Sequence, residues 1–407
     1  MSFVFPLMIA IAIACGLPGC SGPTTSTLPP KEFWDTAFSV NGVRIQSDTL
    51  LNRSVVETGN TYRFSGFFKK FEVKPEIRVG FIGGSITEGA ASSDSLHRYA
   101  GRVCEFLSKT FAKSGFVQID AGIGATNSRF GCSRIAGDLF DFEPDLIVLE
   151  FAVNDDQNDT NGFAETMEGL IRKSLSYAPD VPVILFQTMN RHGDSANHRV
   201  QARIARHYDI PVIGYRSAIW PLIEGKRIPW ESLSPDDVHP NDTGHLICGY
   251  LIYDFLRGTY HAVESKSDSK ISLPPPLYSE LYERAGILGA GDSTLREQSN
   301  TGWSSVLDEK IRMRYASSVR GEKLVLESQA REVTLQFRYS KDLHSRIEVK
   351  VDGEIRDTIS NYFEQDWGGG YLKGQRLFKE TQPSRHRIEL TNLDDSPFDL
   401  RYVLFAP

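Results

Sequence analysis

The sequence predicts an α/β domain built on a parallel sheet, followed by an antiparallel β-sandwich domain. Between residues 75 and 262, short apolar segments bounded by Gly, Pro or Asp alternate with longer segments of helical periodicity. This alternation is typical of parallel strands that are buried on both faces and covered by helices. After residue 277, apolar and polar residues alternate with period two, which is typical of strands with one face in a core. A chain of 407 residues is long enough for two or three domains.

The first 20 residues are expected to be a signal peptide. An apolar block covers residues 3–17 and is too short to span a bilayer comfortably, which indicates the hydrophobic region of an export signal. The segment Leu17-Pro18-Gly19-Cys20 resembles a bacterial lipobox, which would make Cys20 the lipid-modified first residue of the mature protein. Ordinary cleavage and free secretion is the alternative. We therefore expect an exported protein that either meets a membrane only through this lipid, in the periplasm or at the cell surface, or is secreted.

The remaining elements follow in order along the chain. Residues 21–74 are interpreted as a tether and a lead-in to the main domain, with a hairpin expected at 43–53. Within the α/β domain at 75–262, strands are expected at 77–82, 117–120, 146–151, 181–186 and 211–215, and helices at 97–113, 133–140, 163–177, 195–207 and 241–255. Residues 263–276 are rich in Ser, Lys and Pro and read as a linker. Residues 277–407 form the expected jelly-roll-like β-sandwich, in which Asp352-Gly353 marks a tight hairpin turn.

Composition excludes some functions. The net charge of −7 and the absence of a basic stripe argue against nucleic acid as a partner. If Cys15 leaves with the signal and Cys20 carries lipid, Cys104, Cys132 and Cys248 remain, and they form neither a disulfide framework nor a zinc site. We expect no metal and no organic cofactor, and the oligomeric state cannot be read from the sequence.

The main chemical signal lies directly after the first expected strand. The strand ends in Gly83-Gly84, and Ser85 follows at the carboxyl end of the strand. The two glycines permit a sharp turn and leave room for a substrate beside the main chain. In an open α/β sheet, ligands bind at this end of the strands. Ser85 is therefore a candidate nucleophile.

A serine hydroxyl needs a base and an orienting carboxylate before it becomes a useful nucleophile. The segment 234–241 supplies both, since Asp236 and His239 are three residues apart and one helix-like turn can bring the carboxylate to the imidazole. Asp237 is the weaker candidate for the orienting role. The expected oxyanion donors are the Ser85 amide, an amide of the small-residue loop at Gly124, and the carboxamide of Asn154 after the third strand.

Four segments, taken in order, resemble the sequence blocks of the SGNH hydrolases, the GDSL-type esterases, over about residues 77–260. They are Gly84-Ser85, the glycine loop at 122–125, the segment 153–155 around Asn154, and Asp236-x-x-His239. The resemblance implies a flavodoxin-like three-layer catalytic domain with Ser85 as nucleophile, His239 as general base and acid, and Asp236 as its partner. Gly83-Gly84-Ser85 departs from the usual Gly-Asp-Ser. Counting from the strand also places the family's donor glycine at Ala125 rather than Gly124, and the choice stays open here.

An exported esterase with a β-sandwich resembles the two-domain secreted carbohydrate O-acetylesterases. The sequence thus favours a serine esterase that removes O-acetyl groups from a carbohydrate or another small ester, through an acyl-enzyme. An O-acetyltransferase and a lipid or short-chain ester hydrolase are alternatives with the same triad, and a glycan-binding protein with a degenerate hydrolase fold is the non-enzyme alternative. Aromatic residues of the sandwich could stack on sugars or be core residues: Trp303, Tyr339, Tyr362, Trp367 and Tyr371.

Overall fold

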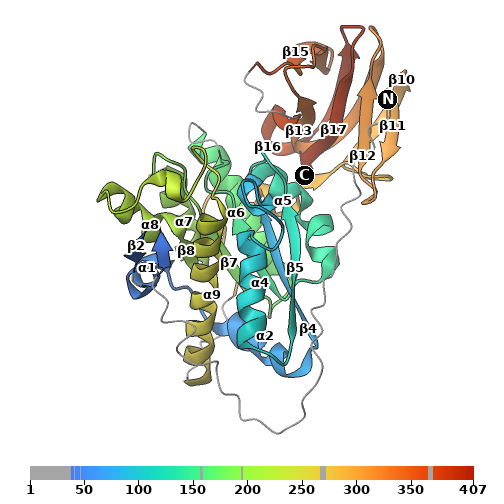
Figure 1. The fold of residues 1–407 in the computed structure, drawn as a ribbon. Helices are drawn as coiled ribbons and strands as arrows, with labels where there is room; N and C mark the ends of the chain where they lie inside the picture. Colours follow the sequence, from blue (N-terminus) through green and yellow to red (C-terminus); the bar gives the residue numbers. More distant parts are fainter. Residues whose placement is uncertain are drawn as a thin grey trace.

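The computed structural model describes residues 38–40, 42–45, 47–155, 159–193, 196–265, 272–364 and 370–407. The expected signal peptide, the lipid site Cys20 and the aromatic residue Trp367 lie outside the described residues. Two domains are present, an α/β domain and a C-terminal antiparallel β-sheet domain, as the sequence predicts (Figure 1). Within the described part of the chain, no helix is both long and apolar enough to cross a bilayer.

The α/β domain is built on a six-stranded sheet with the order β3-β8-β7-β6-β4-β5. The bounds are β3 (Val55–Glu57), β4 (Glu76–Gly83), β5 (Gly115–Gly122), β6 (Leu146–Glu150), β7 (Val183–Gln187) and β8 (Val212–Gly214). Strands β4 to β8 pair in parallel with one another, and the edge strand β3 pairs antiparallel with β8. The five parallel strands were all expected from the apolar runs, whereas β3 was not.

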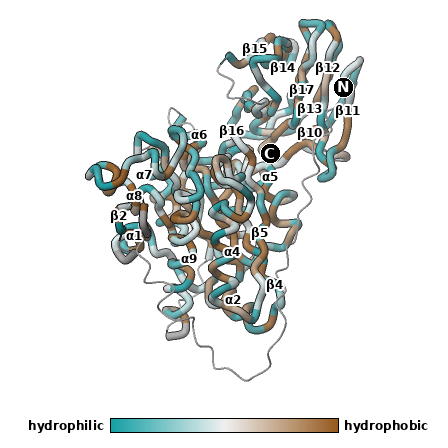
Figure 2. The backbone as a smooth tube through the Cα atoms, in the orientation of Figure 1, coloured by the Kyte–Doolittle hydropathy of each residue, from teal (hydrophilic) through white to brown (hydrophobic). Residues whose placement is uncertain are grey.

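Helices cover both faces of this sheet. One face carries α1 (Ser47–Ser54), α2 (Tyr62–Val73), α4 (Tyr99–Thr110), α8 (Tyr215–Glu224) and α9 (Asp242–Ser265), and the other carries α5 (Ser128–Asp138), α6 (Thr160–Tyr177) and α7 (Ala196–Tyr208). Along β6, Leu146 and Val148 enter the first core, while Ile147 and Leu149 enter the second. Hydrophobic stretches follow α2, α4 and the strands between the layers (Figure 2). Double-sided burial explains why the strand reads as an unbroken apolar run.

The described residues before residue 75 pack on the α/β domain and share its core. The hairpin expected at 43–53 is wrong: strands β1 (Phe38–Val40) and β2 (Val43–Ile45) form a shorter hairpin, and residues 47–54 form α1. Leu50 of α1 is fully buried in the same core as Ile45. In α2, one helical face buries four phenylalanines, so this amphipathic helix completes one face of the sheet.

The C-terminal domain contains nine antiparallel strands that hydrogen bonds join into one sheet among the described residues. The bounds are β9 (Gly286–Ile287), β10 (Leu295–Thr301), β11 (Ser304–Leu307), β12 (Met313–Ser317), β13 (Lys323–Tyr339), β14 (Arg346–Val351), β15 (Glu354–Ser360), β16 (Tyr371–Asn392) and β17 (Phe398–Ala406). Asp352 and Gly353 both have positive φ, at 54° and 85°, and close the β14–β15 hairpin as expected. Strands β13 and β16 pair along their length with register shifts near Ala330.

Buried charged side chains join the two domains. Asp138 of α5 accepts a hydrogen bond of 2.7 Å from Arg312 and another from Lys310, both in the C-terminal domain. Glu332 of β13, whose side chain is only 3% exposed, pairs with Arg129 of α5 at 3.2 Å. The α5 helix is therefore held by both domains.

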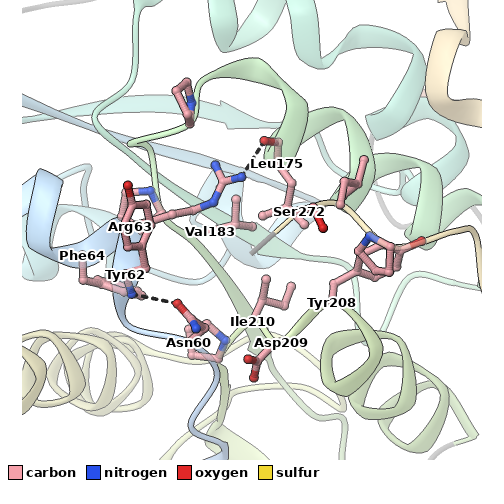
Figure 3. Close-up of a pocket in the computed structure, with 15 residues that line it drawn as sticks. Asn60, Tyr62, Arg63, Phe64, Leu175, Val183, Tyr208, Asp209, Ile210 and Ser272 are labelled. Atoms are coloured by element: carbon pink, nitrogen blue, oxygen red, sulfur yellow. Dashed lines mark hydrogen bonds between the residues drawn. The ribbon is translucent and has the colours of Figure 1, made fainter. Parts of the chain in front are cut away.

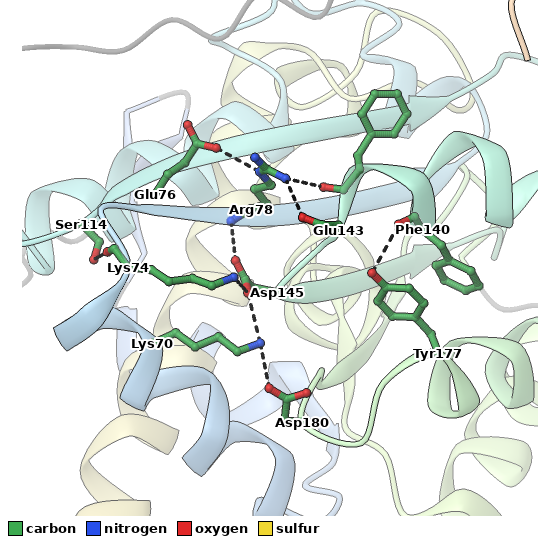
Figure 4. A network of polar contacts seen from close by, with 11 residues as sticks. Lys70, Lys74, Glu76, Arg78, Ser114, Phe140, Glu143, Asp145, Tyr177 and Asp180 are labelled. Carbon is green, nitrogen blue, oxygen red and sulfur yellow. Dashed lines mark hydrogen bonds and ion pairs between the residues drawn. The ribbon is translucent and has the colours of Figure 1, made fainter.

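The amino ends of the parallel strands are closed by polar contacts. Asp145 lies directly before β6 and its side chain is 2% exposed. Its carboxylate lies 3.1 Å from Lys70 Nζ and 2.7 Å from Lys74 Nζ, and it accepts the amide of Arg78 in β4 at 3.1 Å (Figure 4). These contacts fix the start of β6 against β4 and α2.

Arg63 of α2 closes a second part of this end. Its guanidinium donates to the carbonyl oxygens of Leu175, Ala178 and Val181, at 2.8, 2.6 and 3.2 Å. Figure 3 shows the bond to Leu175. A cavity of about 50 Å³ beside it is lined partly by Pro182 and other residues just before β7 and β8. This cavity lies at the opposite end of the strands from Ser85.

Candidate active site

Ser85 stands where β4 ends, as the first residue of the short helix α3 (Ser85–Glu88). The two preceding glycines are required by close packing. A Cβ added to Gly83 would overlap the Thr87 hydroxyl, and one added to Gly84 would overlap the carboxamide of Asn154. The departure from Gly-Asp-Ser therefore has a steric basis in this chain, since no side chain fits at position 84 while Asn154 keeps its place.

The structure brings Ser85, His239 and Asp236 together. The His239 Nε2 atom lies 2.9 Å from Ser85 Oγ, and its Nδ1 atom lies 2.8 Å from Asp236 Oδ2. The His239 side chain is 29% exposed, so solvent reaches the group. The arrangement can move a proton from the hydroxyl to the imidazole while the carboxylate fixes the ring.

The Asp236–His239 turn is itself well held. Asp236 Oδ1 accepts the amides of Val238 and His239, both at 2.7 Å. Partial burial raises the pKa of Asp236, but these amides and the imidazole outweigh it, so the pKa is lowered overall. The Ser234 hydroxyl bonds carbonyl oxygens at both ends of the turn. Asp237 faces away and lies 3.4 Å from Arg191, so it does not orient His239.

Asn154 follows β6 and lies against the nucleophile turn. Its carboxamide contacts the Cα of Gly84 closely enough to exclude a side chain there. The Oδ1 atom is buried without a hydrogen-bond donor among the described residues. The Nδ2 group is thus the end of the carboxamide that can donate to an incoming ligand. The structure places this predicted donor beside Ser85.

The glycine loop after β5 also reaches Ser85. A Cβ on Gly124 would lie 3.8 Å from Ser85 Cβ and 2.7 Å from the Glu88 carboxylate. The amide of Gly124 hydrogen-bonds that carboxylate, so it is already engaged. Ala125 has a positive φ of 55°, and its amide has no acceptor among the described residues. With the Gly124 amide engaged by Glu88, Ala125, the alternative that the sequence left open, is the loop residue whose amide is available.

Two buried carboxylates, Glu150 and Asp155, lie near the site. Glu150, the last residue of β6, is fully buried. Asp155, directly after Asn154, accepts the amide of Ser128 at 2.9 Å, and burial raises its pKa to about 7. The signal that could have identified Glu150 is its place in the sequence, at the end of the apolar run of β6. A charged residue at the end of a buried strand needs hydrogen-bond partners.

The aromatic candidates of the C-terminal domain differ in burial. Trp303, 4% exposed, belongs to the core of the C-terminal domain, whereas Tyr362 is 45% exposed and stacks on His344. The three cysteines within the described ranges are buried and unpaired. In the same ranges, no group of three or more His, Cys, Asp or Glu side chains is arranged to hold a metal ion.

Comparisons with known proteins find a family match and similar solved structures. Residues 81–247 match the model of the GDSL-like lipase/acylhydrolase family. Two crystal structures of a two-domain esterase, CEX, active on acetylated mannans are similar to the chain at 29% identity. The one co-crystallised with mannopentaose has a TM-score of 0.78 and covers 88% of this chain and 97% of its own. The other has a TM-score of 0.79 and covers 88% and 98%.

A more distant similarity is confined to part of the chain. A catalytic mutant of an acetylxylan esterase from Geobacillus stearothermophilus has a TM-score of 0.38 at 19% identity, covering 44% of this chain and 94% of its own. No curated protein sequence matches the chain.

Proposed function

We propose that this chain, a GDSL-type esterase through its family domain at residues 81–247, removes O-acetyl groups from a carbohydrate with Ser85, His239 and Asp236 as its catalytic triad. The resemblance to the SGNH hydrolases is confirmed by the family match and by the two-domain similarity. The observation that carries the proposal is the continuous path from Ser85 Oγ to His239 at 2.9 Å and on to Asp236 at 2.8 Å.

The reaction follows from these contacts. His239 Nε2 takes the hydroxyl proton as Ser85 Oγ attacks the ester carbonyl, and Asp236 stabilises the imidazolium. The developing oxyanion would be met by the amides of Ser85 and Ala125 and by Asn154 Nδ2. The sugar hydroxyl leaves with the proton from His239, which leaves an acetyl group on Ser85. Water, deprotonated by His239, then releases acetate and restores the serine.

The substrate class is proposed from the similar two-domain esterase. CEX acts on acetylated mannans and shares 29% identity with this chain across both domains. Acetylated polysaccharides, with acetylated mannan first, are therefore the substrates to test. The partly exposed His239 at the carboxyl edge of the sheet suits a substrate that approaches from solvent.

Release of acetate tests the proposal. Acetylated mannan, acetylated xylan and p-nitrophenyl acetate would be incubated with wild type, Ser85→Ala and, as a control, Ser304→Ala in the C-terminal sheet. We expect Ser85→Ala to lower kcat by about four orders of magnitude or more, because only binding and the oxyanion donors would remain. Ser304→Ala should keep the wild-type rate. Acetate release unchanged in Ser85→Ala would refute the triad.

The same samples separate the alternatives. Acetyl transfer to an added oligosaccharide without free acetate would indicate an O-acetyltransferase. A preference for long-chain p-nitrophenyl esters would indicate a lipid-directed esterase. Glycan binding by wild type without turnover would indicate a binding protein.

We also propose export of the protein, with a lipid on Cys20, on the basis of the apolar block 3–17 and the lipobox-like segment that ends it. Metabolic labelling with an alkyne fatty acid should mark the full chain and not Cys20→Ala. An unlabelled protein in the culture medium would favour free secretion instead.

A further inference from the structure

Glu150 lies beneath the nucleophile turn with all its surface removed from solvent. The Thr188 hydroxyl donates to its Oε1 at 2.6 Å, and the Thr87 hydroxyl donates to its Oε2 at 3.1 Å. The backbone amides of Gly84 and Ala152 also hydrogen-bond the carboxylate. Among the described residues Glu150 forms no ion pair, so its contacts are neutral donors.

These donors come from three separate turns at the carboxyl edge of the sheet. Gly84 directly precedes Ser85, and Ala152 lies two residues before Asn154. Thr188 follows β7 and also holds His198, whose Nε2 lies 2.7 Å from the Thr188 carbonyl oxygen. One carboxylate therefore connects the turn of the nucleophile, the turn of the oxyanion carboxamide and the next loop of the sheet.

Two of these four partners, the amides of Gly84 and Ala152, can only donate and therefore require an acceptor facing them. Backbone amides cannot reverse their role, and an ionised carboxylate offers two oxygens with several lone pairs. A glutamine would direct an NH₂ group at one of these donors. Burying a carboxylate without a cation is costly, and an apolar residue in its place would leave the amides of Gly84 and Ala152 without an acceptor. The geometry therefore ties this carboxylate to the peptides that flank Ser85 and precede Asn154.

Two of the turns that Glu150 connects are in close van der Waals contact. The main chain of Gly84 touches the Asn154 carboxamide so closely that a single added carbon would overlap it. A change in the direction of the Gly84 amide would displace the Ser85 amide and Asn154 together.

We propose that Glu150 is a positioning residue, whose carboxylate sets the placement of the Ser85 nucleophile relative to the oxyanion donor Asn154. This proposal rests on the proposed esterase function. Glu150 itself is buried and does not touch substrate, so it acts through the peptides that it holds.

The test compares two isosteric changes at opposite ends of one strand, in the full chain. Glu150→Gln reverses one acceptor at the carboxyl edge, and Asp145→Asn makes the equivalent change at the amino edge. With p-nitrophenyl acetate, we expect Glu150→Gln to lower kcat by about 100-fold with KM within a few-fold, because a misplacement near 1 Å has this effect. Asp145→Asn should lower the melting temperature and keep the wild-type kcat.

A second pair of variants, at Thr188, tests the proposal even if Glu150→Gln does not fold. Thr188→Val removes one donor from Glu150, and Thr188→Ser keeps it. We expect a roughly 10-fold lower kcat for the valine variant, which corresponds to about 1.4 kcal/mol of transition-state free energy, and a near wild-type kcat for the serine variant, which keeps the hydroxyl. The rate at which a fluorophosphonate labels Ser85 should fall in parallel with kcat.

Several outcomes would overturn the proposal. One is wild-type kcat and labelling in folded Glu150→Gln, and another is an equal loss of kcat in Glu150→Gln and Asp145→Asn. If Glu150→Gln does not fold, equal kcat for Thr188→Val and Thr188→Ser would overturn it. The esterase function would fail separately, by activity that survives in Ser85→Ala.

Discussion

Strand β6 has a buried carboxylate at each end, and the two are held in different ways. Asp145, before the strand, lies beside Lys70 and Lys74, and these lysines and the Arg78 amide lower its pKa despite burial. Glu150, at the end of the strand, is held by hydroxyl groups and amides, and burial raises its pKa. The carboxylate at the amino end is thus paired with lysine side chains, whereas the carboxylate at the carboxyl end is held by neutral hydrogen-bond donors.

This difference corresponds to the different roles of the two ends of the strand. Ion pairs between flexible lysines and a carboxylate tolerate small displacements, which suits a region that only has to hold strands together. Hydrogen bonds from backbone amides fix direction as well as distance, which suits a region that must place a nucleophile. We therefore expect substitutions at the carboxyl end to change activity, and those at the amino end to change stability.

The largest effect is expected from Asp236→Asn. The amide would hold the wrong tautomer of His239, and in a comparable triad this change lowers kcat by about 10⁴-fold. The matched control is Asp237→Asn, because Asp237 faces Arg191 instead of the imidazole. Steady-state kinetics on p-nitrophenyl acetate would measure both. Equal losses in the two variants would contradict the assignment of Asp236.

A smaller effect is expected from Asn154→Ala, which removes one proposed oxyanion donor. Such a loss lowers kcat by about 10²- to 10³-fold. Its control at the other end of the sheet is Asn60→Ala, where the side chain accepts the Tyr62 amide at 2.8 Å. That variant should change the melting temperature and not kcat. Comparable kcat for wild type and Asn154→Ala would remove Asn154 from the oxyanion hole.

The smallest effect is expected in the pH dependence of stability, with opposite signs at the two ends. Asp145, with a lowered pKa, contributes stability above the unfolded pKa, and this is lost as pH falls through the folded pKa. Asp155, with a pKa raised to about 7, destabilises the fold increasingly as pH rises from the unfolded value near 4 towards 7.

Urea unfolding at pH 5 and pH 8 would measure this contrast. Wild type should lose about 2–3 kcal/mol of unfolding free energy between these pH values relative to Asp155→Asn. Asp145→Asn should not abolish this loss. Parallel pH profiles for wild type and Asp155→Asn would show that Asp155 is ionised in the native state at pH 5.

Much of the fold could be predicted because its signals are local. The apolar run of β6 reflects burial on both faces, and Gly83-Gly84-Ser85 marks a turn whose glycines the packing requires. The N-terminal segment was harder, because α1 is only eight residues long and Leu50 finds its core among distant elements. Tertiary packing decided a segment whose own pattern was ambiguous.

The site could be predicted only in part. Ser85, Asp236 and His239 come together as expected because side-chain type and spacing identify them. The choice between Gly124 and Ala125 depends on the direction of a peptide group, which Glu88 fixes from another loop. Residue type does not encode that direction. The role of Glu150 depends likewise on three turns that meet only in the folded chain.

The polar boundary between the two domains limits how this protein can be recombined. Asp138 and Arg129 of α5 find their partners Lys310, Arg312 and Glu332 in the C-terminal sheet. A chimera that joined the α/β domain to a foreign C-terminal module would leave these charged groups of α5 without their partners. The same helix begins at Ser128, whose amide bonds Asp155 near the site. Exchange of C-terminal domains between relatives would therefore succeed only when the incoming domain carries charged residues at the positions that pair with Asp138 and Arg129.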